Sequence, residues 1–221
     1  MEYRPLGRTE LKVSTLCLGT MTWGEQNTQD EAFAQIERAK AAGLNFIDTA
    51  EMYPVPPRAE TYTRTEQIIG NWFARRGDRA DWVLASKIAG PGNSIGHIRG
   101  GQPRHDRKNI VEALDGSLKR LQTDWIDLYQ LHWPERSTNF FGQLGYQHKE
   151  ESFTALEDTL EVLDEQVRAG KIRHVGLSNE TPWGTMRFLQ IAQERGWPRA
   201  VSIQNPYNLL NRSFEVGLAE I

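Results

Sequence analysis

Short apolar runs alternate with amphipathic stretches along almost the whole chain. Runs of this kind, bounded by turn-forming residues, are typical of buried strands. We predict a strand over each of six runs: residues 16–20, 44–48, 82–87, 126–132, 172–178 and 200–204. Ahead of the first run, residues 3–6 and 11–13 flank a Gly-Arg-Thr-Glu turn, which predicts a β-hairpin.

Between these runs, apolar residues recur at helical spacing. We expect helices over residues 30–42, around the apolar stripes at 68–73, 110–121, 160–167 and 186–189, and from within 213–220. Residues with capping chemistry mark several of their ends. They are Asp106 and Thr181 as N-caps, Thr154 with Glu157 as a capping box, and Gly43 and Gly196 as C-terminal stops.

Six strand–helix repeats in one direction predict a parallel sheet with helices covering it. A doubly wound dinucleotide-binding sheet would show a G-x-G-x-x-G turn after its first strand, and residues 19–24 do not match it. Polar residues recur instead at the ends of several strands, where barrel enzymes hold their chemistry. We therefore predict an α/β fold, a (β/α)8 TIM barrel in one domain over residues 1–221, with the hairpin at its bottom.

Only six of the strand–helix units of such a barrel are present. A complete barrel takes about 250 residues and eight strands, whereas this chain has 221 residues. Six strands alone would leave two unpaired edges and an exposed apolar interior. Two interpretations follow: the chain is a fragment of a longer protein, or a partner closes the gap.

Composition and charge argue against several classes of protein. Charged residues make up 25% of the chain and the formal net charge is −3, so we expect no basic surface for nucleic acid. The first residues hold no apolar signal core and no stretch is long enough to span a bilayer, which predicts a cytoplasmic protein with no membrane partner. The single cysteine, Cys17, lies in an apolar run and is expected to be buried. The oligomeric state is left open.

The five histidines show no ligand spacing such as His-x-x-x-His, so no metal site is predicted. His97, His105 and His148 fall in predicted loops, where we expect them to be exposed, and His174 falls within a strand.

Four titratable residues end or follow successive predicted strands: Asp48, Tyr53, Lys87 and His132. Each alone has an ordinary interpretation as a cap, a turn former or a solvated side chain. Because the carboxyl ends of parallel strands meet at one mouth of a barrel, we expect the four to converge.

These side chains suit the reduction of a carbonyl group. A free tyrosine has a pKa near ~10, and an adjacent ammonium favours the phenolate and lowers that pKa. Lys87 can act on Tyr53 in this way if Asp48 holds it in place. His132 can hydrogen-bond the carbonyl oxygen, and a cofactor would supply the hydride. The alternative is an aldolase that uses Lys87 as a Schiff-base nucleophile.

The segment Asp48-Thr49-Ala50-Glu51-Met52-Tyr53 resembles the Asp-Thr-Ala-x-x-Tyr signature of aldo-keto reductases. Residues 6–9, 18–21, 86–87, 127–132, 170–173 and 176–179 also match motifs of that family, in order and at fitting spacings. The similarity covers nearly all of the chain, and within the family it resembles the bacterial Tas-type branch.

The resemblance implies an NADP(H)-dependent reductase of a small-molecule aldehyde or ketone. Tyr53 would be the proton donor, tuned by Lys87 and Asp48, and the role of His132 would be to orient the carbonyl. The implied cofactor contacts are Gly19, Thr20, Met21, Asp48, Ser178, Asn179 and Gln204. The implied substrate pocket is formed by Trp23, Tyr53, His132 and Trp133.

In the family, the aromatic side chain that stacks on the nicotinamide lies on the seventh strand, and the loop that grips the 2′-phosphate follows the seventh and eighth. Both regions would lie beyond Ile221, so we expect residues 1–221 alone to bind NADPH weakly or not at all. A related branch serves as channel auxiliary proteins, and a non-catalytic cofactor-binding subunit is therefore the alternative to an enzyme.

Overall fold

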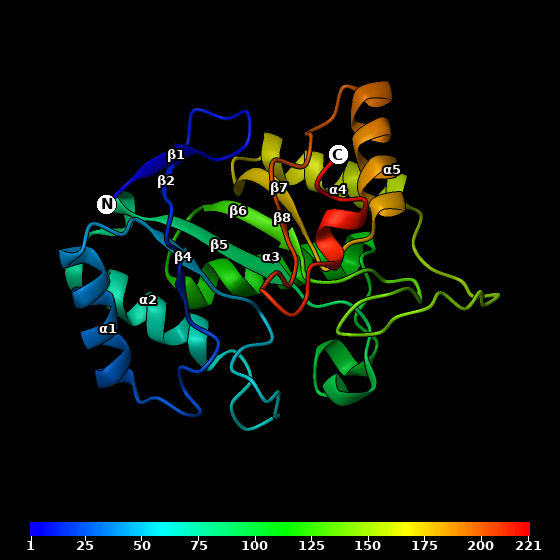
Figure 1. The fold of residues 1–221 in the computed structure, drawn as a ribbon. Coiled ribbons are helices and arrows are strands. Elements are labelled where there is room, and N and C mark those ends of the chain that lie inside the picture. The colour runs from blue at the N-terminus through cyan, green and yellow to red at the C-terminus, as the bar shows by residue number, and fades with distance from the viewer.

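The computed structural model describes all of residues 1–221. One sheet of six parallel strands runs in the order β3-β4-β5-β6-β7-β8, so each strand pairs with its neighbour in the chain. The strands are β3 (Leu18–Gly19), β4 (Phe46–Asp48), β5 (Val83–Ile88), β6 (Ile126–Leu131), β7 (Ile172–Ser178) and β8 (Ile203–Gln204). The sheet curls into part of a barrel (Figure 1), which confirms the predicted fold class and its six units.

Five helices form an outer layer against this sheet (Figure 1). They are α1 (Gln29–Ala41), α2 (Arg64–Arg76), α3 (Arg107–Leu121), α4 (Leu156–Arg168) and α5 (Pro182–Arg195). Successive helices contact one another, from α1 against α2 to α4 against α5. None of them combines the length and the apolarity that crossing a bilayer requires.

Two helices begin at the N-caps that the sequence predicts. The side chain of Asp106 accepts the backbone N–H of Asn109 at 2.9 Å, and that of Thr181 accepts the N–H of Gly184 at 3.2 Å. Such bonds satisfy amide groups that a helix start would otherwise leave unpaired. At the other end of α5, Gly196 takes a left-handed conformation with φ 67° and ends the helix.

The capping box predicted at Thr154 is wrong. Helix α4 is preceded by Ala155 and has no side-chain cap. The backbone N–H and hydroxyl of Thr154 donate instead to Glu135, at 2.8 and 3.2 Å. A carboxylate from another loop thus takes the place of the Glu157 carboxylate, which contacts Arg187 instead.

The predicted helix within residues 213–220 is also wrong. Only a 3-10 turn, η4 (Ser213–Val216), forms there. Nearby, Leu209, Leu210 and Val216 are exposed. Most helical stability in proteins comes from burying an apolar face, and this segment buries little of one.

The predicted N-terminal hairpin is present as β1 (Tyr3–Pro5) and β2 (Lys12–Ser14), paired antiparallel. The side-chain oxygen of Asn45 accepts the backbone N–H of Ser14 at 2.7 Å, and its amide donates to the carbonyl of Lys12 at 2.9 Å. Because Asn45 immediately precedes β4, these bonds attach the hairpin to the N-terminal end of the sheet.

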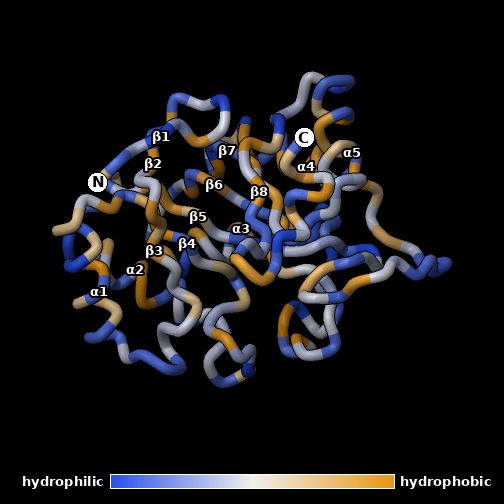
Figure 2. The backbone as a smooth tube through the Cα atoms, in the orientation of Figure 1, coloured by the Kyte–Doolittle hydropathy of each residue, from blue (hydrophilic) through white to orange (hydrophobic).

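The core lies between the sheet and the helices, where 29 buried hydrophobic residues form one cluster. Every residue of β5 and β6 is buried, as in strands covered on both faces. Figure 2 shows hydrophobic residues along the central strands and hydrophilic ones at the outer loops. Cys17 is exposed, contrary to prediction, because it precedes the edge strand β3.

Candidate active site

The four residues singled out from the sequence converge at the C-terminal end of the sheet. Asp48 ends β4, Lys87 lies in β5, and His132 follows β6. The ammonium of Lys87 lies 2.7 Å from Asp48 Oδ2 and 5.0 Å from the centre of the Tyr53 ring. The rings of Tyr53 and His132 meet edge to face with their centres 5.6 Å apart.

Lys87 is an ammonium group with almost no access to water, since 1% of the residue is exposed. Burial alone would favour the neutral amine, but the Asp48 carboxylate and Tyr53 act against it, and the pKa of Lys87 is raised. Its Nζ also donates to the carbonyl of Thr49 at 2.8 Å. A fixed positive charge therefore stands beside Tyr53.

The pKa of Tyr53 shifts upward, which differs from the lowering that we expected. Burial raises this pKa more strongly than the Lys87 ammonium lowers it, and the charge of Asp48 also raises it. The phenol therefore carries its proton at neutral pH. The Lys87 charge is thus not sufficient to ionise the tyrosine.

His132 is a neutral imidazole. Burial, then the charge of Lys87 and then His105 lower its pKa well below the ordinary value. Its Nδ1 is buried without a hydrogen-bond partner. Its backbone carbonyl accepts the side-chain amide of Asn179 at 2.9 Å. This bond holds the backbone at His132, and the ring keeps unused hydrogen-bonding capacity.

Gln130 is a residue of this site that the sequence analysis missed. Its amide donates to Asp48 Oδ1 at 3.3 Å and to the side-chain oxygen of Gln204 at 3.4 Å. The Gln204 amide in turn donates to Asp48 Oδ2 at 3.3 Å. Gln130 could have been found, because it is a polar residue two positions before His132 and therefore shares a face of the strand with it.

The residues implied as cofactor contacts lie around the same site. Ser178 ends β7, and its hydroxyl donates to the carbonyl of Gln204 at 2.9 Å. The Asn179 amide donates to Ser178 Oγ at 3.1 Å, from a left-handed backbone with φ 53°. On the other side, the hydroxyl of Thr20 donates to the carbonyl of Asp48 at 2.8 Å.

The two remaining residues implied as cofactor contacts, Gly19 and Met21, lie on the same side of the site as Thr20. Gly19 pairs with Asp48 in the sheet, and the half-exposed Met21 lines the cavity of the site.

A cavity of about 630 Å³ opens over these groups. One side of the cavity is polar and is lined by Tyr53, Lys87, His132, Ser178, Asn179 and Gln204. Its other walls are largely apolar, with Met21, Met52, Val55, Ile95, Trp133 and Phe141 among them. The arrangement can hold an uncharged group against the tyrosine hydroxyl and the imidazole.

Of the two implied pocket tryptophans, one lines this cavity. Trp133 does so, and its indole N–H donates to the carbonyl of Pro91 at 2.9 Å. Trp23 does not, because it is fully buried in the core and its indole N–H donates to Gln35. An aromatic side chain after a strand end packs equally well against a helix, and here α1 provides that helix.

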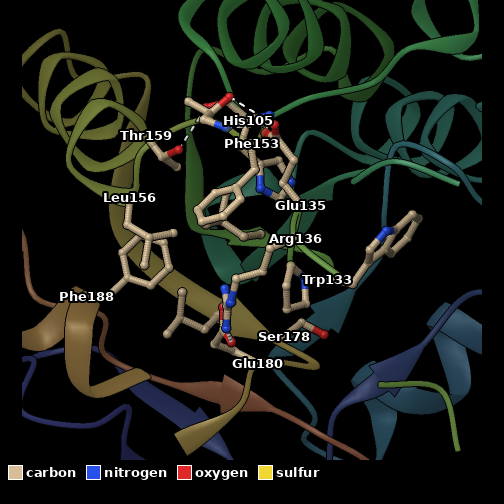
Figure 3. Close-up of a pocket in the computed structure, with 14 residues that line it drawn as sticks. His105, Trp133, Glu135, Arg136, Phe153, Leu156, Thr159, Ser178, Glu180 and Phe188 are labelled. Carbon is tan, nitrogen blue, oxygen red and sulfur yellow. Dashed lines mark hydrogen bonds and ion pairs between the residues drawn. The ribbon is translucent and has the colours of Figure 1, made fainter. Parts of the chain in front are cut away.

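Figure 3 shows a second pocket, which Trp133 also lines. Its volume of about 10 Å³ is at most enough for one water molecule. His105 lines it and is only 4% exposed, contrary to the prediction of an exposed loop residue. The Glu135 carboxylate accepts the backbone N–H of His105 at 2.7 Å, which draws this part of the loop inward. The larger cavity is therefore the candidate active site.

No group of three or more His, Cys, Asp or Glu side chains is arranged to hold a metal ion.

Comparison with known proteins gives consistent matches. Residues 15–221 match the model of the Aldo/keto reductase family. The chain is 56% identical to the Protein tas of Escherichia coli (strain K12), over 100% of this chain and 64% of that protein. It is 37% identical to the Uncharacterized oxidoreductase YrpG of Bacillus subtilis (strain 168), over 98% of this chain and 61% of that protein.

A more distant match is the Norsolorinic acid reductase B of Aspergillus parasiticus, 30% identical over 96% of this chain and 52% of that protein. The chain thus spans between about half and two thirds of the length of these relatives.

Proposed function

The chain belongs to the aldo/keto reductase family, and from this premise we propose that it is an oxidoreductase that reduces an aldehyde or ketone to an alcohol with NADP(H). The observation that carries the proposal is the buried Lys87–Asp48 pair beside the protonated Tyr53, at the wall of one cavity. The names of several relatives, which are called oxidoreductase or reductase, support the same reaction class.

In the proposed reaction, Tyr53 is the proton donor. Its phenol gives its proton to the carbonyl oxygen, and the resulting phenolate is stabilised by the Lys87 ammonium. Asp48 keeps Lys87 charged and in place. The neutral His132 ring hydrogen-bonds the carbonyl oxygen and orients the substrate. When bound, the reduced nicotinamide supplies the hydride to the carbonyl carbon.

The donor and acceptor groups around the cavity fit a nicotinamide carboxamide. Such a group needs both hydrogen-bond donors and acceptors, and Ser178, Asn179 and Gln204 offer hydroxyl and amide groups on one side of Tyr53. The carbonyl oxygen of the Asn205 side chain is also buried without a partner there. We propose these residues as the nicotinamide contacts, with the backbone at residues 19–21 facing them across Asp48.

Turnover of a generic aldehyde with NADPH by the full-length protein tests the proposal. We expect Tyr53→Phe to lower kcat/KM by roughly 10²–10⁴, the range that a positioned proton donor contributes. Tyr146→Phe, at an exposed loop residue, is the matched control and should leave the rate unchanged. The same assay with NADH in place of NADPH tests the cofactor preference.

Three outcomes would overturn parts of the proposal. An unchanged rate in Tyr53→Phe would remove Tyr53 from the reaction. The absence of any carbonyl turnover by the wild-type protein would favour the non-catalytic auxiliary subunit. Borohydride trapping of substrate on Lys87 would favour the aldolase, although a buried, charged and ion-paired lysine opposes Schiff-base formation, which needs the neutral amine.

A further inference from the structure

Arg99 and Glu51 form a buried ion pair outside the catalytic group. The two side chains are 5% and 2% exposed, and the guanidinium contacts the carboxylate directly. Glu51 belongs to the segment that carries Tyr53, whereas Arg99 belongs to the long loop between β5 and α3. Neither residue lines the cavity. The pair therefore joins two segments that are 48 positions apart in sequence without taking part in the reaction.

Several hydrogen bonds hold Glu51 beside the candidate active site. Its backbone N–H donates to the carbonyl of Lys87 at 3.0 Å. Its carboxylate accepts the N–H of Ala89 at 3.0 Å and the hydroxyl of Tyr62 at 3.0 Å. With Arg99 as a further donor, this carboxylate is a fully partnered buried charge, which proteins tolerate only when it is paired in this way.

Arg99 links the two elements between which the loop runs. Its Nη2 donates to the carbonyl of Ala89 at 3.0 Å, and its Nε donates to Asn109 Oδ1 on α3 at 2.7 Å. The Arg99 backbone takes a left-handed conformation, with φ 41°, that non-glycine residues rarely adopt. The guanidinium thus binds the start of the loop, the helix that follows the loop and the Tyr53 segment at once.

The loop that this pair closes is one wall of the cavity. Ile95 lines the cavity and packs with Ile98, Ala89 and Trp133 in a small apolar cluster. Gly90 approaches the Trp133 indole so closely that a Cβ there would lie 2.6 Å from Nε1. Releasing the loop would therefore displace both Ile95 and the support of Trp133.

We propose that the Arg99–Glu51 pair is a positioning element that sets the width of the substrate cavity and so its preference for bulky apolar carbonyl compounds. The inference rests on the proposed reductase function for its substrate. A small aldehyde needs only Tyr53 and His132, whereas a large apolar one also needs the wall formed by Ile95 and Trp133. The pair should therefore affect KM for large substrates and leave kcat for small ones unchanged.

The test is a double variant, Arg99→Met with Glu51→Gln, made in the full-length protein. Changing both residues avoids an unpaired buried charge, which a single change would leave. The matched control is Arg120→Met with Glu66→Gln, because this pair is also largely buried but joins α3 to α2 away from the cavity. Two measurements are made on each protein: KM and kcat for propanal and for a naphthyl aldehyde, and hydrogen exchange of the amides of residues 90–101.

We expect a rise of about tenfold in KM for the naphthyl aldehyde, no change in kcat for propanal, and faster exchange at 90–101 in the Arg99/Glu51 variant only. Equal changes for both aldehydes, or unchanged exchange in the loop, would overturn the inference. If the wild-type protein reduces neither aldehyde, the proposed function fails, and the exchange measurement alone then decides whether the pair holds the loop.

Discussion

The two ends of the sheet both bury an aspartate, but they surround it differently. At the N-terminal end, Asp127 is 1% exposed and accepts from Arg79 at 2.7 Å, Arg173 at 2.7 Å and the N–H of Leu84 at 3.0 Å. At the C-terminal end, Asp48 accepts from one cation, Lys87, and from two amides at 3.3 Å.

At the N-terminal end of the sheet, the charged side chains also pack against an aromatic ring. Arg79 and Arg173 both lie against the indole of Trp125, with guanidinium carbons 4.6 and 5.1 Å from its ring centre. Arg79 also donates to the carbonyls of Trp82 and Trp125. Both carboxylate oxygens of Asp127 are therefore bonded, and a buried polar network of this kind stabilises the fold.

The C-terminal end instead keeps polar groups without partners. His132 Nδ1 is buried and unpaired, and Tyr53 faces the cavity. Each unpaired buried polar atom costs stability unless a ligand satisfies it. At one end of the sheet the buried aspartate is fully paired, whereas at the end with the cavity uncharged polar atoms remain without partners.

The largest expected effect is on stability at the N-terminal end. Asp127→Ala should lower the free energy of unfolding by about 3–5 kcal/mol, because it leaves the buried Arg79 without its carboxylate. Urea denaturation measures this, and kcat/KM of the remaining folded protein should not change. A loss of activity without a loss of stability would reverse the roles assigned to the two ends.

The second largest expected effect is a dependence of the stability on pH, which two histidines near the C-terminal end of the sheet cause. Burial lowers the pKa of His105 to about 4 and lowers that of His132 well below its ordinary value. In the unfolded chain both imidazoles bind protons below pH ~6.5. Since the folded protein then binds fewer protons than the unfolded chain, stability falls as the pH decreases from about 6.5 towards 4.

Denaturation at pH 6.5 and pH 5 measures this dependence. Each imidazole contributes at most about 1.4 kcal/mol per pH unit. Between pH 6.5 and pH 5, His105→Asn should therefore reduce the loss of unfolding free energy by up to about 2 kcal/mol. His148→Asn, at an exposed loop histidine, is the control. An identical pH dependence in wild type and His105→Asn would contradict the assignment.

The smallest effect concerns the amide contacts of Asp48. Gln130→Leu should lower the free energy of unfolding by about 1.5 kcal/mol, the lower limit for a hydrogen bond to a charged group, because its bonds are long and Lys87 remains paired with Asp48. The same denaturation assay applies. A loss as large as that of Asp127→Ala would show that the two ends are held equally tightly.

The sequence by itself determined the order of the strands and the end of the sheet at which the chemistry lies. Asp48, Lys87 and His132 each end or follow an apolar run, and parallel strands bring such ends together wherever the intervening helices pack. The helix starts at Asp106 and Thr181 were also predictable, because an N-cap bonds to residues two or three positions away.

Only the tertiary structure decided the properties that depend on neighbours distant in sequence. The pKa of Tyr53 is raised because burial outweighs Lys87. Trp23 lies in the core because α1 packs over it. The Arg99–Glu51 contact joins two loops that no local pattern connects. Desolvation and long-range pairing depend on how the whole chain packs, and spacing along the chain does not contain that information.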